Sequence, residues 1–560
     1  MHRTIIFPPS LSLLITERAD AALNLELPQW IVGHRAGAGA DFCGLLRAAA
    51  DIANLIFRCG PHQLLGYQRT MSSYDKLGSL RKGGIMAALV LTQLVQMLPF
   101  GSGLAIASNI AEQVGASDVE GAWIAASYPM TQGAFVLIGG RFGDVFGYKN
   151  VLLSGAAWWM IWSLATGFAK TLIQISLFRG LTGIGAAFII PNAVALLGHT
   201  FPPGKMRNLA MGLFGAMAPI GAAGGCVVAA LLAQLTHWKW VFFFFVMLGA
   251  AVFVPLIFLV PHAPPSDEGG KIDWIGAYLG VGGLILFNFV WNQAPSVGWQ
   301  NPYEYVLLIV SVLHFSAFAF WEARIAKSPI LPFNIWTAPS VLALVATVFF
   351  SFMSFGVFSW YVFQWNLNIR NDTLLSAAAS AQPLTVGGVV AAITAALLIP
   401  RISAQYILAI GATAVLVSNL LVATMPAQQI YWQTEFWAVA IVAFSPDFIF
   451  TAAQIVASNS VSKDKQGIAG SLIGTLMTYG MSTGLGFGGT VEVYTNRGGT
   501  DLLRGYRGAL YLGVGFGAIS LILSLLFVRI NKDEREGWDD REGTDETEAA
   551  DKSERTGEVD

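Results

Sequence analysis

The sequence predicts an all-α membrane protein, and three observations support this. Hydrophobic residues make up 55% of the 560 and charged residues only 12%, against about 25% charged in soluble domains. The chain also carries many apolar runs of the roughly 20 residues that a helix needs to cross a bilayer. These runs are uninterrupted, and inside lipid the backbone must satisfy its own hydrogen bonds, so we expect helices rather than a β-barrel.

The apolar runs predict fourteen membrane-spanning helices. Each is bounded by short polar or glycine-rich segments, and neighbouring runs are close enough for antiparallel helices. The predicted ranges are 84–109, 119–140, 150–168, 172–199, 208–235, 239–260, 272–292, 304–325, 338–365, 374–399, 404–424, 433–459, 466–491 and 508–529.

These runs divide the chain into five parts. Residues 1–83 form a predicted cytoplasmic tail, partly disordered, in which Met71 is an alternative start. Residues 84–260 form a bundle of six helices, 261–337 a linker with two further helices, and 338–530 a second bundle of six. The acidic tail at 531–560 cannot bury enough apolar surface to fold.

The distribution of Lys and Arg predicts the orientation of the chain. More of them fall in the loops on the side of the N-terminus, such as Arg141, Lys149 and Arg207, than in the loops on the other side. Positive charge marks cytoplasmic loops, so both termini are predicted to be cytoplasmic. Asn371, Asp372 and Thr373 then form a glycosylation sequon on the outer side.

The sequence lacks the residues that are typical of several classes of function. A net charge of −2 gives no basic field for nucleic acid, and the three cysteines form no pattern with histidine that binds a metal. Glycine clusters such as 484–489 have no Lys-Ser/Thr after them, so no nucleotide site is expected. No nucleophile–base pair suggests an enzyme. We therefore expect no metal, no cofactor and no ATP.

The turn between the second and third predicted helices carries the clearest motif, at residues 139–149. Asp144 can sit near a positive helix N-terminus or pair with an arginine. Gly147 permits the tight turn that joins two membrane helices. Gly140 and Lys149 complete the motif.

Two charged residues within predicted spans, Arg179 and Asp447, are candidate functional residues. Arg179 is costly in a membrane unless it faces a partner, faces a water-filled cavity, or reaches the interface. Asp447 follows Pro446 deep in an apolar run. A carboxyl group removed from water tends to keep its proton, so Asp447 is a candidate for binding protons or substrate. A structural pair with a distant arginine or asparagine is the alternative.

The fifth predicted helix has a face of small residues around a proline. Such a face allows close packing and bending, and its members are Gly215, Pro219, Gly221, Gly224 and Gly225. Polar residues on other helices are candidates for lining a cavity: Gln93, Gln96, Asn192, Gln454 and Asn459. The middle of the first helix has no acidic residue, which favours a neutral or weakly charged substrate.

These motifs resemble the major facilitator superfamily, with fourteen-helix drug:proton antiporters as the closest type. Segment 139–149 matches the signature G-x-L-x-D-x-x-G-x-K/R at Gly140, Asp144, Gly147 and Lys149, with Phe142 in place of Leu. The resemblance implies two pseudo-symmetric six-helix bundles plus two central helices. It also implies a cytoplasmic latch at this motif and proton coupling at Arg179.

The helix around Pro219 resembles the superfamily's antiporter motif, although Ala218 stands where glycine is expected and the final glycine pair is shifted. Segments 190–198, 238–240 and 445–447 resemble a fungal branch that contains aminotriazole-resistance proteins, boron exporters and low-affinity ammonium carriers.

The sequence and this resemblance together predict proton-coupled export of a small compound by alternating access. We expect a monomer in the plasma membrane, with the vacuolar membrane as the alternative, whose partners are the bilayer, protons and the substrate. Two other functions remain open. One is uptake of a small solute such as ammonium by a uniporter or symporter. The other is a sensor that transports nothing.

Overall fold

The computed structural model describes residues 78–201, 204–331, 336, 340–399, 401–459 and 466–528. Within these ranges every regular element is a helix and no strand occurs, which confirms the predicted fold class. The predicted tail at 531–560 and all but the last six residues of the tail at 1–83 lie outside the described residues. The first helix begins at Ser79, five residues before the predicted span.

Six helices form the N-terminal half: α4 (Ser79–Gln113), α5 (Asp118–Phe146), α6 (Tyr148–Phe168), α7 (Leu172–Thr200), α8 (Lys205–Leu235) and α9 (Lys239–Leu259). Two follow in the linker: α10 (Trp274–Val297) and α11 (Pro302–Arg324). The C-terminal half contains α12 (Val341–Gln364), the π-helical turn η2 (Trp365–Ile369), α13 (Leu374–Ser380), α14 (Pro383–Leu398), α15 (Ala404–Thr424), α16 (Glu435–Val442), α17 (Phe444–Asn459), α18 (Gln466–Thr495) and α19 (Leu502–Leu526).

Twelve helical segments of the described chain are long and apolar enough to cross a membrane. Helices α5 and α18 have 29 and 30 residues and are long enough to cross a membrane. They are not among the twelve segments that are also apolar enough. These two helices belong to different halves and pack against each other. The total of fourteen crossings therefore stays a prediction.

The two halves repeat the same packing pattern. In the N-terminal half the first helix packs against the fifth (α4 with α8), and in the C-terminal half α12 packs against α18. The pairs α5 with α7 and α6 with α9 likewise correspond to α14 with α17 and α15 with α19. Two seams join the halves, α5 with α18 and α8 with α14. Each seam is the counterpart of the other, because α5 corresponds to α14 and α8 corresponds to α18. The contacts thus describe two related bundles.

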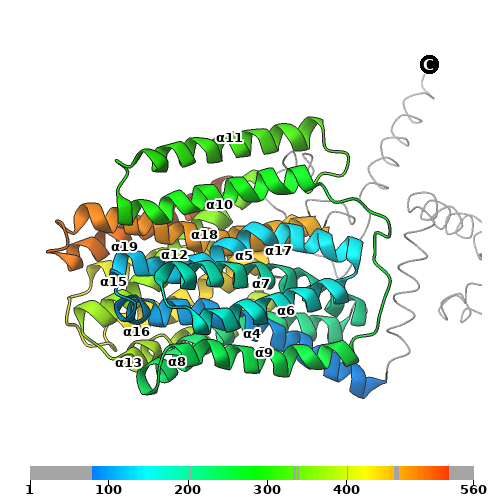
Figure 1. The fold of residues 1–560 in the computed structure, drawn as a ribbon, viewed down its shortest axis with the longest axis horizontal. Coiled ribbons are helices and arrows are strands. Elements are labelled where there is room, and N and C mark those ends of the chain that lie inside the picture. The colour runs from blue at the N-terminus through cyan, green and yellow to red at the C-terminus, as the bar shows by residue number, and fades with distance from the viewer. Residues whose placement is uncertain are drawn as a thin grey trace, which may run out of the picture. The chain divides into compact units, whose positions relative to one another are not determined.

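The linker helices lie on one side of this pair of bundles. Figure 1 shows α11 outermost, with α10 between it and α18. Helix α10 contacts both α5 and α18, whereas α11 packs mainly on α10 and buries only 11% of its most apolar window. One face of α10 therefore covers the seam between α5 and α18.

Two spans of the C-terminal half are broken near prolines. The tenth span is interrupted between Ser380 and Pro383, and the twelfth at Ala443, three residues before Pro446. Proline lacks an N–H group and restricts the residue before it, so helices often end there. As a result Asp447 lies in the first turn of α17, where helix N–H groups favour a negative charge.

Successive helices run in opposite directions, so the bundle has two ends. One end carries the turns 114–117, 169–171, 236–238, 298–301, 370–373 and 496–501, and we name it the Gly115 end. The opposite end carries Gly147 and the segments 260–273 and 399–403, and we name it the Gly147 end.

The halves are joined at the Gly115 end by side-chain hydrogen bonds. Ser108 of α4 donates to Oε1 of Gln364 in α12 at 3.1 Å. The side chain of Gln234 in α8 accepts a hydrogen bond from the amide of Leu375 in α13 at 3.0 Å. Both bonds join the N-terminal half to the C-terminal half, so the two halves meet at this end.

Candidate functional site

Arg179 lies in α7, the fourth helix of its half, with only 2% of its surface exposed. Its Nε donates to the Ile124 carbonyl at 2.6 Å and Nη2 donates to the Pro99 carbonyl at 2.7 Å. Nη1 lies 3.4 Å from the hydroxyl of Ser102. Within the described chain Arg179 has no carboxylate partner, so backbone carbonyls of α4 and α5 hold its charged group inside the N-terminal half.

Gln93 and Gln96 belong to a chain of buried glutamines between α4 and α5. Nε2 of Gln96 donates to Gln93 at 3.0 Å, and Nε2 of Gln132 donates to Gln96 at 2.8 Å. Gln96 has no exposed surface and Gln93 has 8%. Gln96 therefore contacts other glutamines in this conformation, and Gln93 is the less deeply buried end of this row of hydrogen bonds. The sequence interpretation did not include Gln132.

Asp447 lies beside the seam between α8 and α14. A Cβ atom built on Gly388 of α14 would be 2.6 Å from Cβ of Pro219 and 3.4 Å from Oδ2 of Asp447. The Asp447 carboxylate has no hydrogen-bond or ion-pair partner within the described residues. Asp447 and Pro219 are separate candidate residues in the sequence, and in the structure both lie next to Gly388.

The glycines of α8 separate into two groups. Gly221 and Gly225 pack against the backbone of α4, where Cβ atoms would lie 3.1 Å from Cα of Leu94 and 2.9 Å from Cα of Leu98. Cβ atoms at Gly215 and Gly224 would meet nothing within 4 Å. Close packing therefore requires glycine at Gly221 and Gly225 but not at Gly215 and Gly224.

The neighbouring glycines Gly224 and Gly225 give a matched pair of substitutions. Gly225→Ala should destabilise the protein by about 1–3 kcal/mol, because an added methyl group forces α4 and α8 apart. Gly224→Ala should leave stability unchanged. Thermal unfolding of the purified variants in detergent measures the difference, and equal melting temperatures would contradict the assignment of the two faces.

The motif at 139–149 contacts mainly the start of the linker. Asp144 accepts from the hydroxyl of Tyr148 at 2.7 Å, and its carbonyl accepts from the amide of Asp267 at 3.0 Å. Lys149 donates to the carbonyls of Ile257 and Val260 at 2.8 and 2.7 Å. These carbonyls end α9, where a cation is favoured.

Two glycines of the motif have distinct positions. Gly147 has a φ of +89° in the turn between α5 and α6, a conformation that favours glycine. A Cβ on Gly140 would lie 2.9 Å from the hydroxyl of Ser471 in α18. Gly140 thus faces the C-terminal half directly. The latch at this motif stays a prediction.

The remaining candidate residues have different surroundings. Asn192 is fully buried and donates to the Gly139 carbonyl at 3.0 Å, so it joins α7 to α5. Gln454 donates to the Gly470 carbonyl at 3.2 Å and joins α17 to α18. The side chain of Asn459 lies outside the described residues. Asn371 is exposed in a turn at the Gly115 end, with a φ of +59°.

Two buried polar clusters were not predicted from the sequence. Arg370 forms an ion pair with Glu435, whose surface is 1% exposed, and Asn366 donates to the same carboxylate at 2.6 Å. Tyr361, which is fully buried, donates to Glu492 at 2.8 Å. Glu435 and Glu492 lie near the ends of predicted spans, where acidic residues normally face water, so neither could be recognised as buried from the sequence.

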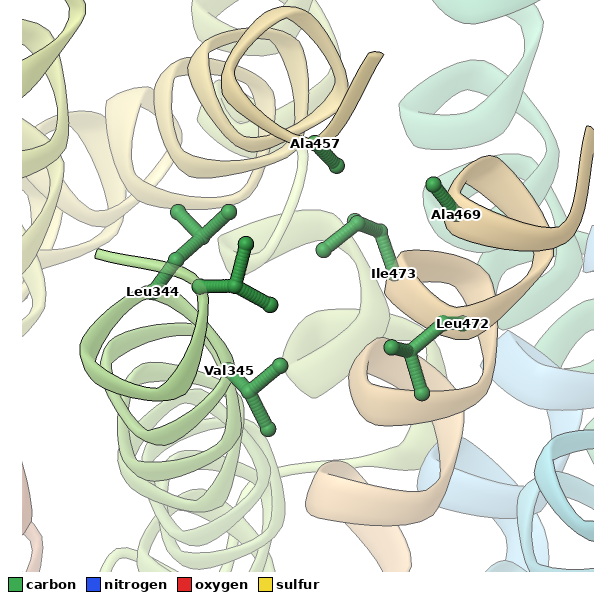
Figure 2. Close-up of a pocket in the computed structure, with 7 residues that line it drawn as sticks. Leu344, Val345, Ala457, Ala469, Leu472 and Ile473 are labelled. Carbon is green, nitrogen blue, oxygen red and sulfur yellow. The ribbon is translucent and has the colours of Figure 1, made fainter. Parts of the chain in front are cut away.

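A pocket at the Gly147 end is entirely apolar. It lies between α12, α17 and α18, and Figure 2 shows aliphatic side chains from all three helices pointing into it. Its lining residues are Val341, Leu344, Val345, Ala457, Ala469, Leu472 and Ile473. With no polar group to orient a solute, this pocket is a packing gap within the C-terminal half.

This arrangement defines a multi-pass membrane protein made of two related helical bundles, with charged residues buried in the fourth helix of each. The family model described as Major Facilitator Superfamily matches residues 88–485. The chain therefore belongs to the Major Facilitator Superfamily and is a membrane transporter. This confirms the resemblance drawn from residues 139–149.

Characterised relatives come from the fungal branch suggested by the sequence. The chain is 36% identical to the low affinity ammonium transporter of Saccharomyces cerevisiae, covering 80% of this chain and 88% of that protein. It is also 36% identical to the aminotriazole resistance protein of the same yeast, with coverages of 78% and 82%. The efflux pump terJ of Aspergillus terreus is 36% identical as well, with coverages of 79% and 86%.

Solved structures agree on the fold. A POT family transporter in complex with a thioalcohol conjugated peptide superposes with a TM-score of 0.60 at 12% identity, covering 79% of this chain and 94% of that one. The nucleoside transporter NupG superposes with a TM-score of 0.56 at 12% identity, covering 80% of this chain and the whole of that one.

Proposed function

We propose that the protein exports a small compound across the plasma membrane in exchange for protons. Asp447 carries this proposal, because its carboxylate has no partner within the described chain and lies beside the seam between α8 and α14. An acidic residue inside a membrane span is functional by default. Protonation of Asp447 would remove its negative charge from beside this seam, where the two halves must move relative to each other.

Arg179 supplies the second charged group of this mechanism. Its three contacts are to uncharged oxygens of α4 and α5, so its positive charge is not neutralised by the described residues. A fixed positive charge in one half favours the ionised form of a carboxyl group that approaches it. Arg179 would therefore favour proton release from Asp447 if the cycle brings the halves closer.

The substrate that fits best is small and neutral or weakly charged. The buried polar residues of α4 are Thr92, Gln93, Gln96 and Ser102, and none of them is acidic. Gln93 is the accessible member and our candidate for direct contact. Relatives named for ammonium transport and for aminotriazole resistance suggest the compounds to test first.

The orientation follows the distribution of positive charge. We place the Gly147 end in the cytoplasm, because Arg141, Lys149 and Lys271 lie there and positive charge marks cytoplasmic loops. Both termini would then be cytoplasmic, and Asn371 would face outward. The contacts of Asp144 with Ser266 and Asp267 suggest that the cytoplasmic latch includes the start of the linker.

The test of export uses a host cell that lacks its own exporters. Cells that produce the protein are loaded with aminotriazole or methylammonium, and their content is followed with and without a protonophore. Faster loss that the protonophore stops is the expected result. Entry that is insensitive to the protonophore would instead favour a uniporter for uptake, the second candidate, for which the ammonium relative gives some support.

A further inference from the structure

The linker helix α10 is joined to the seam between α5 and α18 by buried polar residues. Asn288 and Asn292 of α10 are 0% and 4% exposed. Ser482 and Thr483 of α18 have no exposed surface. Buried polar residues are costly in a pair of linker helices that faces lipid, because each must find a hydrogen-bond partner.

These four residues form a continuous network. Nδ2 of Asn288 donates to the Thr483 hydroxyl at 2.9 Å. Nδ2 of Asn292 donates to Oδ1 of Asn288 at 2.8 Å and to the Ser482 carbonyl at 3.2 Å. The stacked rings of Trp291 and Phe487, with centroids 3.6 Å apart, flank the network.

Ser482 connects this network to the N-terminal half. Its hydroxyl oxygen lies 2.9 Å from the carbonyl of Ala126 in α5 and 2.9 Å from Oδ1 of Asn288 in α10. A serine hydroxyl has only one hydrogen to donate. It can therefore satisfy either the N-terminal half or the linker helix, but not both at once.

We infer that Ser482 is a hydrogen-bond switch, and that Asn288 of α10 is a positioning residue for the transport cycle. While α5 and α18 are in contact, the hydroxyl can donate to Ala126. When the halves separate at this level, it can turn to Asn288, so the buried donor stays satisfied. Asn288 thereby lowers the free-energy cost of breaking the seam.

A neighbouring contact shows how closely α5 and α18 pack near Ser482. About two turns further along α5 toward the Gly147 end, Gly133 packs so closely on α18 that a Cβ would lie 2.7 Å from the amide nitrogen of Tyr479. The backbones of the two helices are therefore close, and the Ser482–Ala126 contact must break if the Gly115 end opens. The inference rests on alternating access, which is part of the proposed function.

The experiment measures the opening of the Gly115 end in lipid nanodiscs. Spin labels are placed at Glu112 and Thr500, two exposed residues on opposite halves, after the native cysteines are replaced. Asn288→Leu removes the alternative acceptor and should raise the ratio of closed to open protein roughly 3-fold to 20-fold, the range for membrane hydrogen bonds. Ser482→Ala removes the bond that the hydroxyl makes in each state, to Ala126 when the seam is closed and to Asn288 when it is open, and should change that ratio much less.

The double variant Asn288→Leu/Ser482→Ala should behave like Ser482→Ala, because the proposed switch couples Asn288 to the seam through that hydroxyl, while its bonds to Thr483 and Asn292 are the same in both states. The control is Asn419→Leu, which removes another fully buried asparagine whose partners, Ser354 and Val415, lie within the C-terminal half. It should lower the melting temperature without changing the distance distribution. If Asn288→Leu fails to insert, Asn288→Ala removes the same acceptor with less bulk.

No shift in Asn288→Leu, or a shift of the same size when Ser482→Ala is added, would overturn the switch. If the wild-type protein shows one distance at every pH and substrate concentration, the proposed alternating access fails, and the switch fails with it. Exchange in the wild type with unshifted variants would overturn the switch alone.

Discussion

Asp447→Asn should reduce proton-driven export to the level of cells without the transporter, while the amount of inserted protein stays normal. The amide has nearly the same shape but cannot gain or lose a proton in the physiological range. Since no described residue pairs with the carboxylate, the substitution leaves no partner unsatisfied. Efflux with and without a protonophore, normalised to protein at the cell surface, measures this effect.

A second assay separates loss of coupling from loss of transport. Exchange of labelled for unlabelled substrate at equal concentrations needs no net proton movement and should continue in the Asp447→Asn variant. Asp501→Asn is the control, because Asp501 accepts a hydrogen bond from the amide of Arg504 at the start of α19 and faces no seam. Wild-type, protonophore-sensitive export by Asp447→Asn would remove Asp447 from the mechanism.

Glu435→Ala should prevent most of the protein from folding, because it leaves Arg370 charged and buried without its partner. Removing one member of a buried ion pair costs about 3–5 kcal/mol, which is comparable to much of a protein's total stability. The amount of monodisperse protein recovered in mild detergent, together with its melting temperature, measures the loss.

The double variant Arg370→Met/Glu435→Leu tests the cause. It removes both charges and fills similar volume, and such replacements are often neutral or stabilising. Recovery well above that of Glu435→Ala is expected. If the double variant folds no better than the single one, the ion pair would not explain the loss, and the hydrogen bond from Asn366 would become the better explanation.

Most of the helices could be predicted from the sequence because long apolar runs mark segments that can cross a membrane. The sequence did not predict that α4 begins at Ser79, since Arg81 and Lys82 lie outside any apolar run. It also did not show the break before α17, although Pro446 is the kind of residue that causes one. The position of Asp447 in a first helical turn depends on that break.

The candidate site was only partly predictable, because a polar residue in a span can face a cavity or another helix. The sequence interpretation treated Gln96 and Asn192 as cavity residues. The structure places Gln96 between Gln93 and Gln132, and Asn192 against the backbone of α5. Which partner a side chain finds depends on how α4, α5 and α7 cross, and helix periodicity does not determine that.

The solitary carboxylate at Asp447 has a consequence for the energy available to the transporter. If that single group carries one proton inward per cycle and the exported compound is neutral, each turnover moves one net charge across the membrane. A potential of 100 mV then contributes about 2.3 kcal/mol, and a pH difference of one unit adds about 1.4 kcal/mol. Their sum would sustain a concentration ratio of roughly 500-fold across the membrane, and cells whose membrane is depolarised would lose most of that capacity.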